Sequence, residues 1–99
     1  MIEVTRVQTG VRIEHALIKV LKGLAEYKNM GLGDLLEGIC LHALEGKTPF
    51  SRDTLEQIAH LRQVYGLKLT AADSHQLYEP KSVARSRTRR SSQRRRSAR

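Results

Sequence analysis

The chain has 99 residues, a formal net charge of +8 and a single cysteine, Cys40. Its length limits it to one small domain, and one cysteine excludes an intramolecular disulfide framework and fits a reducing, intracellular setting. No apolar run approaches the length of a membrane span, and the N-terminus lacks the charged and then apolar layout of a signal peptide. We therefore expect a cytoplasmic protein without a membrane partner, whose small core is completed by dimerising.

The first 13 residues read as extended. In residues 7–13 the side chains alternate with the period of a half-buried β-strand. The β-branched face carries Val7, Thr9, Val11 and Ile13, and the opposite face carries Gln8, Gly10 and Arg12. Ile2 and Val4 have the opposite parity, so the strand is not expected to reach Met1.

Residues 14–28 change to helical spacing, with Asn29 as a plausible C-terminal stop. The apolar stripe consists of Leu17, Ile18, Leu21, Leu24 and Ala25. A second helix follows a short connection, and Gly46 ends it; its stripe consists of Leu35, Leu36, Ile39, Cys40, Ala43 and Leu44. We expect both stripes, including the Cys40 thiol, to be buried core.

A linker over residues 47–50 precedes a third helix that ends at Gly66. Asp53 and Glu56 have the spacing of a capping box, although either Ser51 or Asp53 could be the N-cap of this helix. Thr70 and Asp73 mark the start of another short helix, running to about Tyr78. The predicted fold class is therefore mainly α with one short N-terminal β-strand and extra C-terminal helices.

The excess positive charge is confined to the C-terminal end of the chain. Residues 81–99 hold nine of the 18 basic residues and no acidic one, whereas residues 1–80 hold nine basic and ten acidic residues, a net charge of −1. The basic residues are Lys81, Arg85, Arg87, Arg89, Arg90, Arg94, Arg95, Arg96 and Arg99. Such a segment cannot repay the entropy of ordering, so we expect residues 80–99 to form a disordered tail that binds a polyanion through counterion release. A merely solubilising appendage is the alternative.

The order of elements in residues 7–44 resembles the ribbon-helix-helix family of dimeric DNA-binding proteins. The resemblance rests on Val7-Gln8-Thr9-Gly10-Val11-Arg12-Ile13, on Leu17, Leu21 and Leu24-Ala25, and on Asn29-Met30-Gly31-Leu32-Gly33-Asp34-Leu35-Leu36. It implies that the strands of two copies pair into a ribbon that enters the major groove, with Gln8, Gly10 and Arg12 at the base edges. It also implies a DNA phosphate at the start of the second helix, on Leu32, Gly33 and Asp34. Arg6 belongs to the basic cluster that we expect at the phosphate backbone.

The sequence thus predicts a homodimeric, sequence-specific DNA-binding protein, a transcriptional regulator that would be nucleoid-associated in a bacterium. Residues 1–46 would be the DNA-binding domain, and residues 51–79 a helical extension that packs on the dimer or receives a protein partner. The alternative is a helical protein-interaction module, antitoxin-like or an adaptor, in which only the arginine-rich tail touches nucleic acid.

Catalysis, metal binding and cofactors find no support in the residue pattern. Cys40 and His42 are two residues apart, and no second pair completes a zinc site. Asp73, Ser74 and His75 hold the residue types of a catalytic triad, but side chains adjacent in sequence point in different directions. We therefore predict that the protein is not an enzyme.

Overall fold

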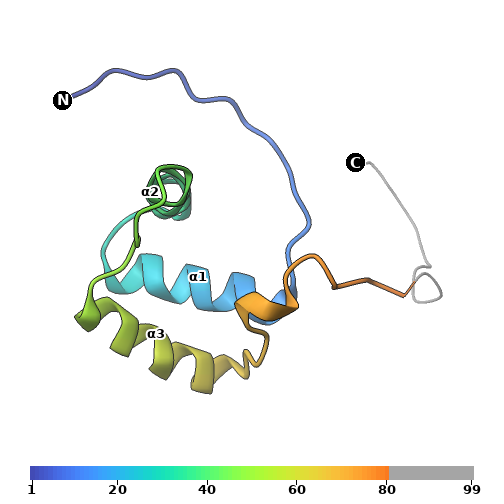
Figure 1. Cartoon of the computed structure of the whole chain (residues 1–99). Coiled ribbons are helices and arrows are strands. Elements are labelled where there is room, and N and C mark those ends of the chain that lie inside the picture. Colours follow the sequence, from blue (N-terminus) through green and yellow to red (C-terminus); the bar gives the residue numbers. More distant parts are fainter. Residues whose placement is uncertain (81–99) are drawn as a thin grey trace. The chain divides into compact units, whose positions relative to one another are not determined.

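The computed structural model describes residues 1–80, in which the regular elements are three α-helices and one 3₁₀ helix (Figure 1). The α-helices are α1 (His15–Tyr27), α2 (Leu32–Leu44) and α3 (Arg52–Tyr65), and the 3₁₀ helix is η1 (Ala71–Asp73). The chain divides into two units, Met1–Lys68 and Leu69–Arg99. The three α-helices all belong to the first unit.

Each α-helix is followed, within two residues of its last position, by a residue with left-handed backbone. These residues are Asn29 (φ 58°), Gly46 (φ 74°) and Gly66 (φ 70°). After α1, the N–H of Met30 donates to the carbonyl of Ala25 at 3.0 Å, and the N–H of Asn29 donates to that of Glu26 at 3.1 Å. This pair of bonds is a Schellman motif, which satisfies carbonyls that the helix end would leave without donors. The predicted helix ends at Asn29, Gly46 and Gly66 are confirmed.

The helix starts are set by side-chain caps at α1 and α3. The Glu14 carboxylate accepts the N–H of Leu17 at 2.8 Å, and the Ser51 hydroxyl accepts the N–H of Thr54 at 3.2 Å. Ser51 is therefore the cap of α3, the first of the two candidates in the sequence. The residue before α2 is Gly31, which has no side chain to offer.

α1 is the central helix of the first unit and packs against both α2 and α3. In Figure 1, α1 and α3 run across the view while α2 is seen nearly end-on. The core cluster consists of Leu24, Ala25 and Leu35, with the partly buried Leu21, Ile39, Phe50, Ile58 and Leu61 packed around it. Val20 and Leu67 are buried as well. The core is small and aliphatic, as the composition predicts.

α1 and α3 pack closely at Gly23. A Cβ atom built on Gly23 would stand 3.0 Å from Cδ2 of Leu61 and 3.5 Å from Cε2 of Tyr65. The missing side chain lets the two helices pack closely, and this offsets the entropic cost of a glycine inside a helix.

The predicted N-terminal strand is wrong, because residues 1–80 contain no β-strand and residues 1–14 have no regular structure. The ribbon pairing is corrected with it, since these residues form no ladder in the structure. The alternating pattern of residues 7–13 predicted that one face would be covered. Instead Val7 is 83% and Val11 74% exposed, so neither reaches the helices.

In the second unit the structure describes residues 69–80. The Asp73 carboxylate accepts the N–H of Thr70 at 2.8 Å as part of a capping box, and a helix does start at the predicted position. The element it begins is only the three residues of η1, so the expected helix to Tyr78 is wrong. The prediction of a disordered tail falls on residues 81–99, which lie outside the described residues.

Candidate interaction surfaces

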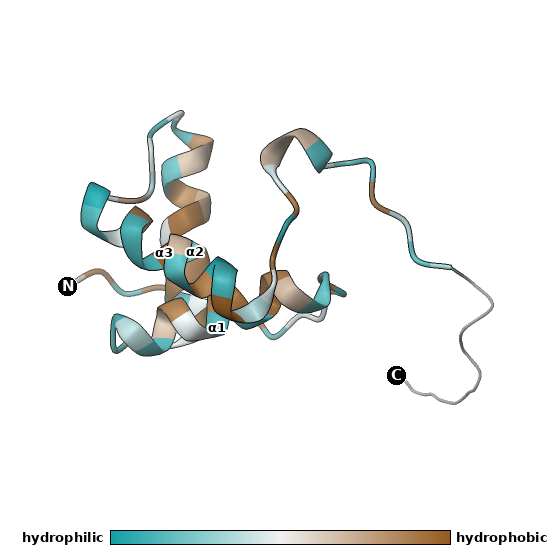
Figure 2. Cartoon of the chain, turned by 90° about the horizontal axis from the view of Figure 1, so that it is seen from below, coloured by the Kyte–Doolittle hydropathy of each residue, from teal (hydrophilic) through white to brown (hydrophobic). Residues whose placement is uncertain are grey.

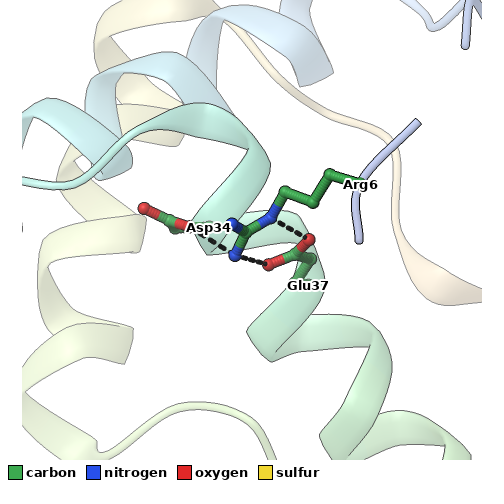
Figure 3. A network of polar contacts seen from close by, with 3 residues as sticks. All are labelled: Arg6, Asp34 and Glu37. Atoms are coloured by element: carbon green, nitrogen blue, oxygen red, sulfur yellow. Dashed lines mark hydrogen bonds and ion pairs between the residues drawn. The ribbon is translucent and has the colours of Figure 1, made fainter. Parts of the chain in front are cut away.

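The N-terminal segment, residues 1–14, is joined to α2 by the side chain of Arg6 (Figure 3). Its Nε donates to Oε2 of Glu37 at 2.8 Å, and its second guanidinium nitrogen donates to Oε1 of Glu37 at 2.9 Å and to Oδ1 of Asp34 at 3.4 Å. Such two-pronged pairs combine charge with fixed geometry. The hydrogen bond from Arg6, together with its positive charge, lowers the pKa of Glu37, and partial desolvation opposes the change.

The start of α2 carries the residues that the resemblance places on a DNA phosphate. The helix begins at Leu32, so Gly33 is its second residue and Gly31 is the cap. Asp34 lies in the first turn, and Glu37 follows one turn later. The Asp34 carboxylate suits the positive end of the helix dipole, which is the charge that a phosphate would otherwise meet. A phosphate arriving here would be repelled by two acidic side chains and would find Arg6 already paired.

The residues that the resemblance places at base edges are Gln8, Gly10 and Arg12. All three are exposed, on the stretch between the Arg6 tether and the start of α1. A Cβ built on Gly10 would meet nothing within 4 Å. The structure therefore leaves this stretch open to solvent, with its polar and its apolar side chains alike accessible.

The second half of α2 presents an exposed apolar surface, and the sequence analysis assigned its residues Cys40, Ala43 and Leu44 to the core. Leu35 is the buried residue of the helix, whereas Leu41 is 66% and Leu44 84% exposed. Cys40 is exposed too, so its predicted burial is wrong. Figure 2 shows apolar residues along α2. The periodic stripe was read correctly as apolar, but α1 covers only its first half.

α3 also carries exposed apolar residues, which lie on different sides of the helix. Leu55 and Val64 are its exposed aliphatic residues, and Tyr65 is also exposed in part. The start of this helix is fastened to the end of α1, because Nζ of Lys28 donates to the hydroxyl of Thr54 at 3.4 Å and Ser51 donates to the same oxygen at 3.1 Å. The extension predicted to receive a partner thus shares a core with α1.

The residues that the sequence analysis considered for catalysis or metal binding make hydrogen bonds to groups nearby in the sequence. Asp73 caps η1, and the hydroxyl of Ser74 donates to the carbonyl of Ala71 at 2.6 Å. Nδ1 of His42 donates to the carbonyl of Gly38 at 2.7 Å. Within residues 1–80, no three His, Cys, Asp or Glu side chains gather as metal ligands would. The arginines of residues 81–99 lie outside the described part of the chain.

In comparisons with known proteins, no family model, curated protein or solved structure matches the chain significantly. Over residues 1–80, no helix has the length and apolar character needed to cross a bilayer.

Proposed function

We propose that the protein binds nucleic acid, DNA in particular, through the arginine-rich segment 81–99, while the helical body associates with other protein chains. The observation that carries the proposal is the separation of charge along the sequence. All of the excess positive charge lies in residues 81–99, and residues 1–80 have a net charge of −1. The two parts of the chain therefore suit different partners.

The segment fits the phosphate backbone through its charge. Each phosphate that a lysine or arginine neutralises releases a condensed counterion, and affinity for duplex DNA then falls with salt concentration with a log–log slope of about −0.9 per phosphate. Eight arginines and one lysine without an acidic neighbour give a steep slope and little preference for sequence. This term supplies affinity, and any choice of target belongs elsewhere.

The helical body has the character of an association module. Leu41 and Leu44 are exposed on a helix that carries Asp34 and Glu37 in its first half and is followed by Glu45 and Lys47. An apolar patch with a polar rim is typical of protein interfaces. The body therefore supports the interaction-module part of the proposal.

A matched pair of triple variants tests the role of the segment in the full chain. Replacing Arg94, Arg95 and Arg96 with glutamine should flatten the log–log salt dependence of duplex binding by about 2.7, because three phosphate contacts are lost. Replacing the exposed Lys19, Lys22 and Lys68 removes the same charge from the body and should leave the slope unchanged. Fluorescence anisotropy with a labelled duplex between 50 and 200 mM salt measures both. Equal effects of the two triples would contradict the proposal.

A second candidate function is base selection by the N-terminal segment, and with it transcriptional regulation. The observation in its favour is that Gln8 and Arg12 are exposed, since these side chain types bond bidentately to adenine and guanine. Selection from a random duplex pool should then give the wild-type chain a consensus that Arg12→Ala loses, while total affinity is kept by the arginine-rich segment. A wild-type chain that enriches no sequence refutes this candidate and leaves the first one standing.

A further inference from the structure

We propose that two copies of the chain dimerise through α2, with the helices antiparallel and Cys40 at the two-fold axis. The inference rests on the proposed function only for the idea that the body is an association module, and it names the partner as a second copy. The exposed apolar side chains of α2 would be covered in such a dimer.

The stripe on α2 is symmetric about Cys40. Leu36 and Leu44 lie four residues before and after it, which is about one helical turn in each direction, so the three side chains share one face. A two-fold interface requires a surface that is complementary to itself. In an antiparallel pair centred on Cys40, Leu36 of one copy faces Leu44 of the other, so that the partly buried leucine covers the most exposed one.

Charge favours the antiparallel arrangement over the parallel one. Asp34 and Glu37 lie in the first half of α2, and a parallel pair would bring these carboxylates together with their own copies. An antiparallel pair separates them from their own copies and places them towards the end of the partner helix, where Glu45 is paired with Lys47. The helix dipoles also oppose one another in this arrangement, which is the favourable alignment.

The Arg6 tether extends the apolar surface. Helical spacing puts Glu37 on the same stripe as Leu41 and Leu44, so the segment that Arg6 fastens there lies at the beginning of that stripe. This segment carries the exposed Val4 and Val7. A pair of 13-residue helices is only about 20 Å long, so the added apolar side chains enlarge what the dimer can bury. Val4 and Val7 are therefore present on each copy, on a segment that Arg6 joins to α2.

Dimerisation would also add buried apolar surface to a body whose core is small. Within residues 1–80 the buried apolar side chains are Val20, Leu24, Ala25, Leu35 and Leu67. A chain of this size buries a low fraction of its surface, and oligomerisation is a common way to add to it. The polar rim keeps the same face compatible with water before assembly.

Cys40 supplies a direct test, because it is the chain's single cysteine and any link through thiols must join two copies. Packed helices have axes 8–10 Å apart, so a short bismaleimide should bridge the two thiols at the axis. The full-length wild type should run as a dimer by light scattering at micromolar concentration and give a cross-linked pair. Cys40→Ser should remain a dimer and lose the cross-link.

Two double variants that introduce acidic side chains locate the interface. Leu41→Glu with Leu44→Glu should weaken self-association by on the order of 100-fold or more, since each copy loses two leucines that the dimer buries. Leu55→Glu with Val64→Glu makes the same change on exposed residues of α3 and should leave the dimer intact. Circular dichroism establishes that each variant keeps its helices. Both double variants keep Cys40. The Leu41 and Leu44 variant should therefore lose the bismaleimide product because it no longer dimerises.

Three outcomes overturn the inference: a monomeric wild type, a dimer whose Cys40 thiols do not cross-link, or a dimer dissociated equally by both double variants. Failure here is separable from failure of the proposed function. The Arg94, Arg95 and Arg96 triple variant should bind DNA weakly and still dimerise. The Leu41 and Leu44 variant should be monomeric and still show the salt-dependent binding of its arginine-rich segment.

Discussion

Arg6 and Glu37 form a two-pronged ion pair across 31 residues of sequence, and this pair joins the N-terminal segment to α2. Both side chains are largely exposed, so the pair is open to salt and to pH. The Arg6 hydrogen bond holds the pKa of Glu37 below its ordinary value of 4.5. The tether is therefore present above that value and is lost as the pH falls through the lowered pKa.

Glu37→Gln should release the segment at neutral pH, because a neutral amide cannot replace the charged acceptor. The backbone NMR order parameters of residues 3–13 should fall, and salt should no longer change them. Glu45→Gln is the matched control, since it removes the same charge from the other end of α2, where Glu45 pairs with Lys47 at 3.5 Å. Equal order parameters in the wild type and Glu37→Gln would show that the ion pair does not hold the segment.

The helices could be predicted from the sequence because their signals are local. Asn29, Gly46 and Gly66 are residues that tolerate left-handed backbone, and each one ends a helix. Ser51 is an N-cap type that stands directly before its helix. These signals act within one turn, so no knowledge of the tertiary fold is needed to read them.

The strand and the extent of the core could not be predicted in the same way. A period-two pattern at Val7 and Val11 predicts a covered face only if another element is there to cover it, and no helix of the described chain does so. The stripe on α2 has the same weakness, since it gives the apolar face without saying how far α1 reaches along it. The Arg6–Glu37 pair joins residues too distant in sequence for any local pattern to link.

Ser51→Ala should destabilise the body by about 1 kcal/mol, because the first turn of α3 loses its cap. The Ser51 hydroxyl accepts the N–H of Thr54 and donates to the Thr54 hydroxyl, and Thr54 is buried. Thr48→Ala, an exposed change in the same linker, should have little effect. Urea unfolding followed by circular dichroism measures the difference, and equal midpoints for the two variants would rule out the cap.

Gly23→Leu should destabilise the body by about 1–3 kcal/mol through overpacking of α1 against α3. The new Cβ would stand 3.0 Å from Leu61, and the rest of the side chain would have to displace Leu61 or Tyr65. Gly38→Leu is the control on α2, where a new Cβ meets nothing within 4 Å and helix propensity improves. The same urea titration compares them. A Gly23→Leu chain as stable as the wild type would mean that α1 and α3 do not pack closely at this point.

Glu14 should make the start of α1 sensitive to acid. Its carboxylate accepts the N–H of Leu17 at 2.8 Å, and hydrogen bonds from the backbone of Leu17 and Ala16 lower its pKa from the ordinary 4.5. A lowered folded-state pKa means that the cap stabilises the helix above about that pH and is lost as the pH falls below it.

Glu14→Gln should therefore weaken the wild-type cap at pH 6 and make the stability of the body depend less on pH between 6 and 3. Glu26→Gln is the matched control, because it removes the same charge near the other end of α1, where a negative side chain opposes the helix dipole. At pH 6 the first variant should be less stable than the wild type and the second should not. Urea unfolding at the two pH values measures this, and a pH dependence that survives Glu14→Gln unchanged would place its origin in another carboxylate.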